Sequence, residues 1–344
     1  MASSQRSGLS QVALVSPSDV GKAVGIAAMA SISWLLPESR WPGLCRLLAR
    51  GLGGAPDGGA GIAALIDGQR IPADPDSIYR SSRATSLESY LQLLRDYRPG
   101  GWKPASSLQG AEHLEAALRR GRGAVLWLPL FAGYGFVAKV VLSEAGFEVS
   151  HLSHPRHGFS ETRFGMRFLN PIRTRAENRY LKSRIMMSRD SSAEALRESL
   201  ARVRANEIVS ITAGGAAAQP VSVPFLNGDF LVAGGAPSLA HATGAALLPV
   251  FPLLEGAGSV RVVIAAPVER QSGETKRQFV ARAALTFSKQ MEAYVRRHPE
   301  QWRGWVGNGR GQQAVADRIE GLGQRRLHEP HEERDEHRRA APPA

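Results

Sequence analysis

Short apolar runs that alternate with helical patterns constrain the fold of this chain most. The run AVLWL, residues 124–128, follows a turn with Gly121 and Gly123 and is typical of a buried parallel strand. Further strands are predicted at 147–152, 207–212, 220–225, 246–251 and 259–265, and helices at 86–97, 111–119, 136–145, 192–205, 236–243 and 276–297. Strands that alternate with helices predict an α/β sheet with helices on both faces.

Length and charge narrow the classes of function. The chain has 344 residues, is 43% hydrophobic and carries a formal net charge of +12, so it forms a real core and favours anionic partners. A nucleic-acid-binding protein would show clusters of Lys and Arg interleaved with aromatic residues, and the chain shows none, so no nucleic acid partner is expected. The single Cys45 excludes an internal disulfide framework and is expected to be a small buried group.

The N-terminal part, residues 1–50, is predicted to associate with a membrane. Its apolar run AVGIAAMASISWLL, 23–36, is shorter than the roughly 20 residues that span a bilayer and contains Ser31 and Ser33. We therefore expect a helix in the membrane interface, with Trp34 and Trp41 near headgroup level. An ordinary buried helix is the alternative.

Composition divides the rest of the chain. The glycine-rich stretch GLGGAPDGGAG, 51–61, is predicted to be a flexible joint. Residues 62–311 form the predicted α/β domain. Residues 312–344 are rich in Arg, Glu, His and Pro with few apolar residues, and are predicted to be a disordered charged tail.

Three segments together resemble the lipid A biosynthesis acyltransferase family, the lauroyl- and myristoyl-transferring branch of the lysophospholipid acyltransferase superfamily. They are VSVPFLNGDFLVAGGAPSLAHATGAALLPVF (221–251), MEAYVRRHPEQWRGW (291–305) and TRFGMRFLNPI (162–172), in the family's order. The resemblance covers roughly residues 15–306 of the printed sequence. It implies a mixed central sheet flanked by helices, held at the cytoplasmic face of the bacterial inner membrane. It also implies transfer of a fatty acyl group from acyl carrier protein or coenzyme A, as a co-substrate and with no cofactor, to a hydroxyl of a lipid or glycolipid.

The family's catalytic pair is missing. That pair is a His, four intervening residues, and a Glu or Asp, in which the imidazole deprotonates the acceptor hydroxyl and the carboxylate orients it. When the pattern is laid on LWLPLFAGYGF, 126–136, it falls on Leu130 and Gly135. The segment 210–217, SITAGGAA, also lacks the carboxylate that the family usually carries there. The alternative is therefore an inactive relative that binds a lipid, an acyl chain or a partner enzyme.

The segment SHLSHPRHGFSE, 150–161, at the end of a predicted strand, contains the candidates for a replacement base. The candidates are His154, His157 and Glu161, and His157 and Glu161 are four residues apart, which suits one helix face. Such histidines are more often surface or phosphate-contacting groups. The stretch has no Cys and no recognised ligand spacing, so no metal is predicted.

Two further groups are assigned from the resemblance. Guanidinium groups suit phosphate, and Arg156, Arg163 and Arg167 lie where the phosphate of the acceptor or acyl carrier is expected, with a solvated basic face as the alternative. Aromatic side chains suit an acyl groove or simply the core, and the candidates are Trp127, Phe131, Tyr134 and Phe225. The acceptor, the acyl length, the donor and the oligomeric state stay open.

Overall fold

A computed structural model describes residues 13–71, 73–155, 157–188, 191–214, 220–256 and 258–306. Its residues up to Val306 belong to one compact unit. The predicted tail, 312–344, lies outside the described residues.

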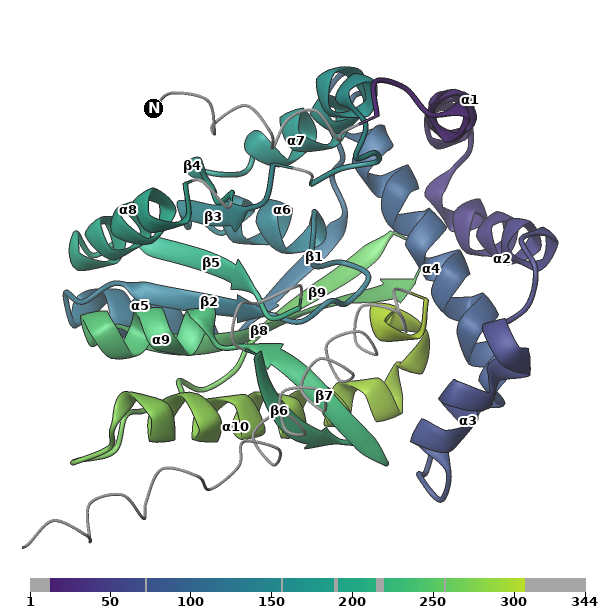
Figure 1. The fold of residues 1–344 in the computed structure, drawn as a ribbon. Coiled ribbons are helices and arrows are strands. Elements are labelled where there is room, and N and C mark those ends of the chain that lie inside the picture. Colours follow the sequence, from purple (N-terminus) through teal and green to yellow (C-terminus); the bar gives the residue numbers. More distant parts are fainter. Residues whose placement is uncertain are drawn as a thin grey trace, which may run out of the picture. The chain divides into compact units, whose positions relative to one another are not determined.

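Within this described part, seven strands form one mixed sheet (Figure 1) in the order β1-β9-β8-β2-β5-β3-β4. Neighbouring strands from β8 to β4 are parallel, whereas β9 is antiparallel to β8 and parallel to β1. The strands are β1 (Ala105–Gln109), β2 (Ala124–Leu128), β3 (Val149–Ser153), β4 (Ser183–Met186), β5 (Ile208–Thr212), β8 (Ala246–Gly256) and β9 (Ser259–Ile264). The predicted mixed α/β sheet is thus confirmed. A separate antiparallel pair is formed by β6 (Pro220–Phe225) and β7 (Gly228–Ala233).

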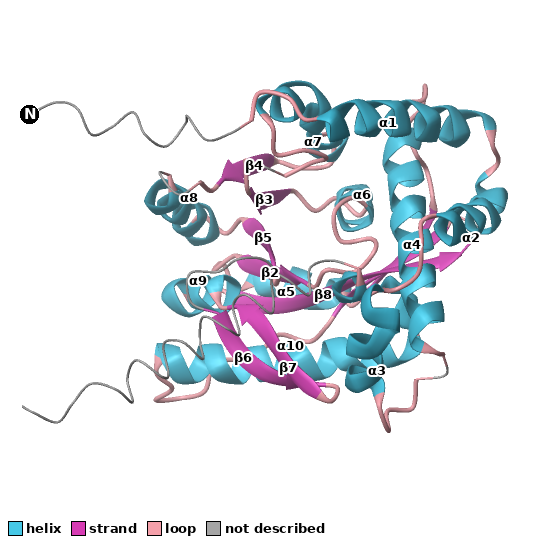
Figure 2. Cartoon of the chain, turned by 45° about the vertical axis from the view of Figure 1, so that its right-hand side comes forward, coloured by secondary structure: helices cyan, strands magenta, loops and turns pink. Residues whose placement is uncertain are grey.

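Helices cover both faces of the sheet because β2 is apolar on both sides. Val125 and Trp127 join one core cluster, and Leu126 and Leu128 join the other. The first cluster is completed by α8 (Ser192–Arg204), α9 (Gly235–Thr243) and α10 (Lys276–Arg297), and the second by α5 (Ala111–Arg119) and α6 (Val137–Glu144). Figure 2 shows α9 and α10 separated from α6 by the strands. A strand that is buried on both faces has apolar residues at successive positions, which explains the run AVLWL.

The N-terminal helices α1 (Pro17–Leu35) and α2 (Trp41–Gly51) pack against α4 (Pro75–Arg95). A small core between α2 and α4 contains Cys45, which is fully buried as predicted, and burial raises the pKa of its thiol to about 12. Trp41 belongs to the same core and is 1% exposed. Its expected position near lipid headgroups is therefore wrong, because the indole packs on α4. Trp34 is 44% exposed.

Two other parts differ from expectation. The stretch 51–61 is partly helical, since a 3-10 turn covers Pro56–Gly59 and α3 (Ala60–Ile66) follows. The helix predicted at 86–97 begins at Pro75, where the Asp74 side chain accepts a hydrogen bond from the Ser77 N–H as an N-cap. The proposed domain limits stay predictions.

The described part of the chain has no helix long and apolar enough to cross a membrane. Along α1, Val20 and Val24 are exposed, as is Leu35 at its end. The membrane-interface helix stays a prediction.

Candidate functional site

The junction between β2 and α6, where the family's catalytic pair would lie, is filled by other side chains. A Cβ atom on Gly135 would lie 2.3 Å from Nη2 of Arg173. A Cβ atom on Gly214 would lie 2.3 Å from Cδ1 of Leu130, so the leucine side chain covers this glycine. The guanidinium of Arg173 and the aliphatic side chain of Leu130 thus occupy the two positions.

The C-terminal segment PEQW fixes the backbone of this junction. The Ala132 N–H donates to the Gln301 carbonyl at 2.8 Å, and the Arg303 N–H donates to the Leu130 carbonyl at 2.9 Å. The buried Gln301 amide also exchanges two hydrogen bonds with the backbone of Leu254 in β8, at 2.9 and 2.7 Å. This segment therefore ties the junction to the sheet.

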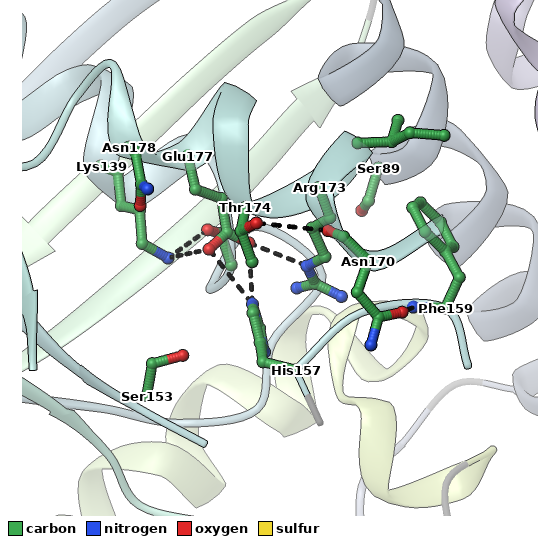
Figure 3. A network of polar contacts seen from close by, with 12 residues as sticks. Ser89, Lys139, Ser153, His157, Phe159, Asn170, Arg173, Thr174, Glu177 and Asn178 are labelled. Atoms are coloured by element: carbon green, nitrogen blue, oxygen red, sulfur yellow. Dashed lines mark hydrogen bonds and ion pairs between the residues drawn. The ribbon is translucent and has the colours of Figure 1, made fainter. Parts of the chain in front are cut away.

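A buried carboxylate, Glu177, lies beside the junction (Figure 3) at the end of α7 (Asn170–Asn178). Its side chain is fully buried and accepts from Nε of Arg173 at 2.8 Å and from Nη2 of Arg184 at 2.8 Å. Nζ of Lys139 lies 3.4 Å from the same carboxylate. Nε2 of His157 lies 3.0 and 3.1 Å from its two oxygens. Four segments of the chain, α6, the loop after β3, α7 and β4, thus meet at one carboxylate.

This carboxylate lies near Gly135, the residue on which the acid of the family's pattern falls. Oε1 of Glu177 lies 3.7 Å from the position that a Cβ atom on Gly135 would take. A carboxylate and imidazole pair is therefore present at the junction, with the carboxylate supplied by α7.

The loop that carries His157 is held on both sides. Oδ1 of Asn170 accepts from the N–H groups of Phe159 and Ser160, at 2.7 and 2.9 Å. The Ser160 and Thr162 hydroxyls donate to Asp19, which is buried near the start of α1, at 2.6 and 2.7 Å. Such contacts give the imidazole a fixed position, as a reactive group requires.

The charges of the cluster shift its pKa values. Burial would raise the pKa of Glu177, but the neighbouring Lys139 and Arg173 hold it well below its usual range. Burial lowers the pKa of Lys139 to about 8, although Glu177 opposes the shift. Burial also lowers the pKa of His157, partly offset by its hydrogen bond to Glu177. A neutral imidazole beside an ionised carboxylate is the state required of a general base.

The structure rearranges the predicted catalytic candidates. Residues 157–161 are not helical, so the expected pairing of His157 with Glu161 on one helix face is wrong, and His157 pairs with Glu177 instead. His154 and Glu161 are both exposed. The described residues contain no group of three His, Cys, Asp or Glu side chains able to hold a metal ion.

The predicted phosphate-binding arginines are not part of this cluster. Arg163 and Arg167 are exposed, near and within a π-helical turn over Gly165–Leu169 that precedes α7. Arg156 lies outside the described residues. Their role stays a prediction.

The predicted groove aromatics are mostly interior. Trp127, Phe131 and Phe225 are at most 2% exposed and belong to the main core cluster, where Trp127 stacks on Phe287 at 4.3 Å. Tyr134 is half-buried, and the guanidinium carbons of Arg173 and Arg303 each lie 6.0 Å from its ring centroid. The acyl-groove role of the four residues stays a prediction.

Sequence reasoning missed Lys139, Arg173, Glu177, Arg184 and Arg303. The spacing of Arg173 and Glu177, four residues apart, was the available signal. Such a pair usually lies on a solvated face, and only the tertiary structure shows it buried.

The chain is similar to proteins of known class. Residues 97–306, more than half of the chain, match the family described as bacterial lipid A biosynthesis acyltransferase. The class of the protein is therefore that of the acyltransferases. The chain belongs to the bacterial lipid A biosynthesis acyltransferase family.

One solved structure that resembles the chain is the 1-acyl-sn-glycerophosphate (LPA) acyltransferase from Thermotoga maritima. The two are 11% identical, the match covers 75% of this chain and 98% of that one, and the TM-score is 0.35. No curated protein matches the chain. The family assignment rests on the family match.

Proposed function

We propose that this protein transfers a fatty acyl group from a thioester, acyl carrier protein or coenzyme A, to a hydroxyl of a membrane lipid or glycolipid. The observation that carries the proposal is the His157 and Glu177 pair at the junction. Its carboxylate oxygen lies 3.7 Å from the Cβ position of Gly135, where the family's acid is expected. The proposal assigns base catalysis to His157 and makes Glu177 a positioning residue.

The transfer proceeds in balanced steps. Nε2 of His157 faces Glu177, so Nδ1 is the nitrogen left to take the proton of the acceptor hydroxyl. The hydroxyl oxygen then forms a bond to the thioester carbonyl carbon. The carbon–sulfur bond breaks, and the imidazolium returns its proton to the leaving thiolate.

The proposed location is the cytoplasmic face of the bacterial inner membrane. Large apolar side chains are exposed on the two N-terminal helices, including Val20 and Val24 on α1 and Leu47 and Leu48 on α2. Exposed apolar groups of this kind suit a membrane interface, and a net charge of +12 suits anionic lipid.

Turnover tests the proposal directly. The purified protein on vesicles is incubated with labelled acyl-coenzyme A or acyl-carrier-protein donors and lipid extract of its host, and labelled lipid is measured by mass. We expect His157→Ala to lower the rate by about 10²–10⁴-fold, the usual contribution of a general base. His113→Ala on α5, outside the cluster around Glu177, is the matched control. Equal rates in wild type and His157→Ala would remove His157 from the mechanism.

The pH profile gives a second readout. Burial lowers the pKa of His157 below the usual histidine value of 6.5, so the imidazole loses its proton at a lower pH than an ordinary histidine does. The acid limb of kcat/KM is therefore expected below pH 6.5, and an acid limb above that value would contradict the assignment.

A second candidate is a non-catalytic relative that binds a lipid, an acyl chain or a partner enzyme. It is favoured by what stands at the two positions of the family's catalytic pair. Leu130 covers Gly214 with an aliphatic side chain, and the guanidinium of Arg173 covers Gly135. This candidate would be favoured if the protein binds acyl chains and vesicles but forms no more product than a boiled control with any donor tested.

A further inference from the structure

The cluster around Glu177 holds more positive than negative charge. Lys139, Arg173 and Arg184 are each at most 11% exposed at the side chain, and Glu177 is 0% exposed. In the described part of the chain, Glu177 is the one carboxylate in ion-pair contact with these cations. A buried charge is costly unless it is paired, so a further anion would stabilise this cluster.

The donors of this cluster that form no hydrogen bond with a described residue lie on the side of the junction. Nε of Arg173 is used by Glu177, while its two terminal nitrogens make no hydrogen bond to any described residue, and Nη2 is the atom beside Gly135. Arg184 differs, because its three nitrogens are satisfied by Asn178, Ser153 and Glu177. The charge left over is therefore presented by Arg173.

A second guanidinium lies on the same tyrosine. The Arg303 carbon is 6.0 Å from the Tyr134 ring centroid, as is that of Arg173, so the two guanidinium carbons are no further apart than twice that distance. Arg303 makes no side-chain hydrogen bond or ion pair with the described residues, and its backbone is fixed by Leu130. Two arginines whose terminal nitrogens bond no described residue thus lie beside one half-buried aromatic ring.

We infer that Arg173 and Arg303 form a binding site for a phosphate group of the substrate, beside Tyr134. Planar guanidinium groups match phosphate oxygens through paired hydrogen bonds, and phosphate supplies the negative charge that the cluster lacks. The inference rests on the proposed function for its substrate, which is either the lipid acceptor or the phosphate-bearing acyl donor. Arg173 and Arg303, rather than the exposed Arg163 and Arg167, are then the phosphate contacts nearest the junction.

Lys139 supplies a linked signature. It is faced by Glu177 and Arg173 from α7, by Arg184 from β4, by His151 from β3 and by His157 from the loop after β3. Because its pKa is about 8, a bound anion stabilises the ammonium and draws a proton onto it near that pH. Phosphate binding is then accompanied by proton uptake, which Lys139→Met removes.

Binding of inorganic phosphate by the full chain is the first experiment, measured by titration calorimetry in two buffers of different ionisation enthalpy at pH 8.5. We expect Arg173→Gln and Arg303→Gln each to weaken binding by about tenfold, as loss of a charged hydrogen bond does. The matched controls are Arg175→Gln, exposed on the same helix as Arg173, and Arg297→Gln, exposed near the end of α10. Equal weakening in the controls, or no binding by the wild type, would overturn the inference.

Two further arms identify the source of the phosphate. Phosphatidylcholine vesicles with and without phosphatidic acid test a lipid headgroup, and coenzyme A tests the donor. Dependence on Arg173 and Arg303 in either arm supports the site and names its source, and independence in both arms overturns it. The His157→Ala variant separates this inference from the proposed function, because it is expected to lose turnover and keep phosphate binding.

Discussion

Oε1 of Glu177 lies 3.7 Å from the position that a Cβ atom on Gly135 would occupy. Between them comes the guanidinium of Arg173, whose Nε donates to Glu177 and whose Nη2 fills the space above the glycine. The buried ion pair of Arg173 and Glu177 therefore depends on the glycine, because a side chain at residue 135 and the guanidinium would occupy the same space.

Gly135→Ala tests this arrangement. The added methyl group would meet Nη2 of Arg173 at 2.3 Å, so the guanidinium has to move away from its place beside the junction. We expect a loss of about 1–3 kcal/mol in the free energy of unfolding, typical of overpacking, measured by urea denaturation.

The control for that change is Gly25→Ala in α1, where an added Cβ atom meets nothing within 4 Å. It is expected to stabilise the protein by up to about 1 kcal/mol through helix propensity. Combining Gly135→Ala with Arg173→Gln should cost less than the sum of the two single changes, and strict additivity would mean that the two residues do not share this space.

Much of the fold could be predicted because its elements have strong local patterns. The helix over Lys276–Arg297 repeats apolar residues at helical spacing, and it has the predicted bounds. The strands β1 and β4 were missed, because ASSLQ and SRIM carry few apolar residues and pair at or near the sheet edge. Their placement depends on neighbouring strands rather than on their own composition.

The candidate site could be predicted only in part. His157 was a candidate because it follows a strand end, where ligands gather in open α/β sheets. Its partner could not be found from spacing, because Glu177 is 20 residues away on α7 and only the tertiary structure brings it to the loop after β3. Lys139 likewise becomes part of the site because it is buried. The apolar sequence around it predicts burial of its neighbours but not of the lysine itself.

Glu177→Gln is predicted to be strongly destabilising. It leaves Lys139, Arg173 and Arg184 buried together without a counter-charge, and removal of one partner of a buried pair typically costs about 3–5 kcal/mol. The free energy of unfolding from urea titrations measures it. The matched change Glu198→Gln breaks a partly exposed pair with Arg202 on α8 and is expected to cost less than about 1 kcal/mol. Comparable losses in both variants would show that the buried cluster is not special.

Stability should rise with pH through the titration of Lys139. Its pKa is 10.5 in an unfolded chain and about 8 in the folded one, so between these values the unfolded state binds more protons. The contribution of Lys139 to the free energy of unfolding is fully present above pH 10.5 and is lost as the pH falls through about 8. We expect the difference in unfolding free energy between wild type and Lys139→Met to shift in favour of wild type from pH 8 to 9.5. A difference that stays constant with pH would show that Lys139 titrates normally.

Gln301→Leu tests how the C-terminal segment supports the site. The leucine has a similar volume, but it leaves the N–H and the carbonyl of Leu254 without their buried partners, at a cost of about 1–3 kcal/mol for each group. Because the Gln301 backbone also holds Ala132, the loop between β2 and α6 is expected to loosen as well. Hydrogen exchange of the Ala132 amide should rise in Gln301→Leu and stay unchanged in Glu300→Gln. Unchanged exchange in both variants would mean that the junction is held by other contacts, such as the hydrogen bond from the Ser89 hydroxyl to the Ala132 carbonyl.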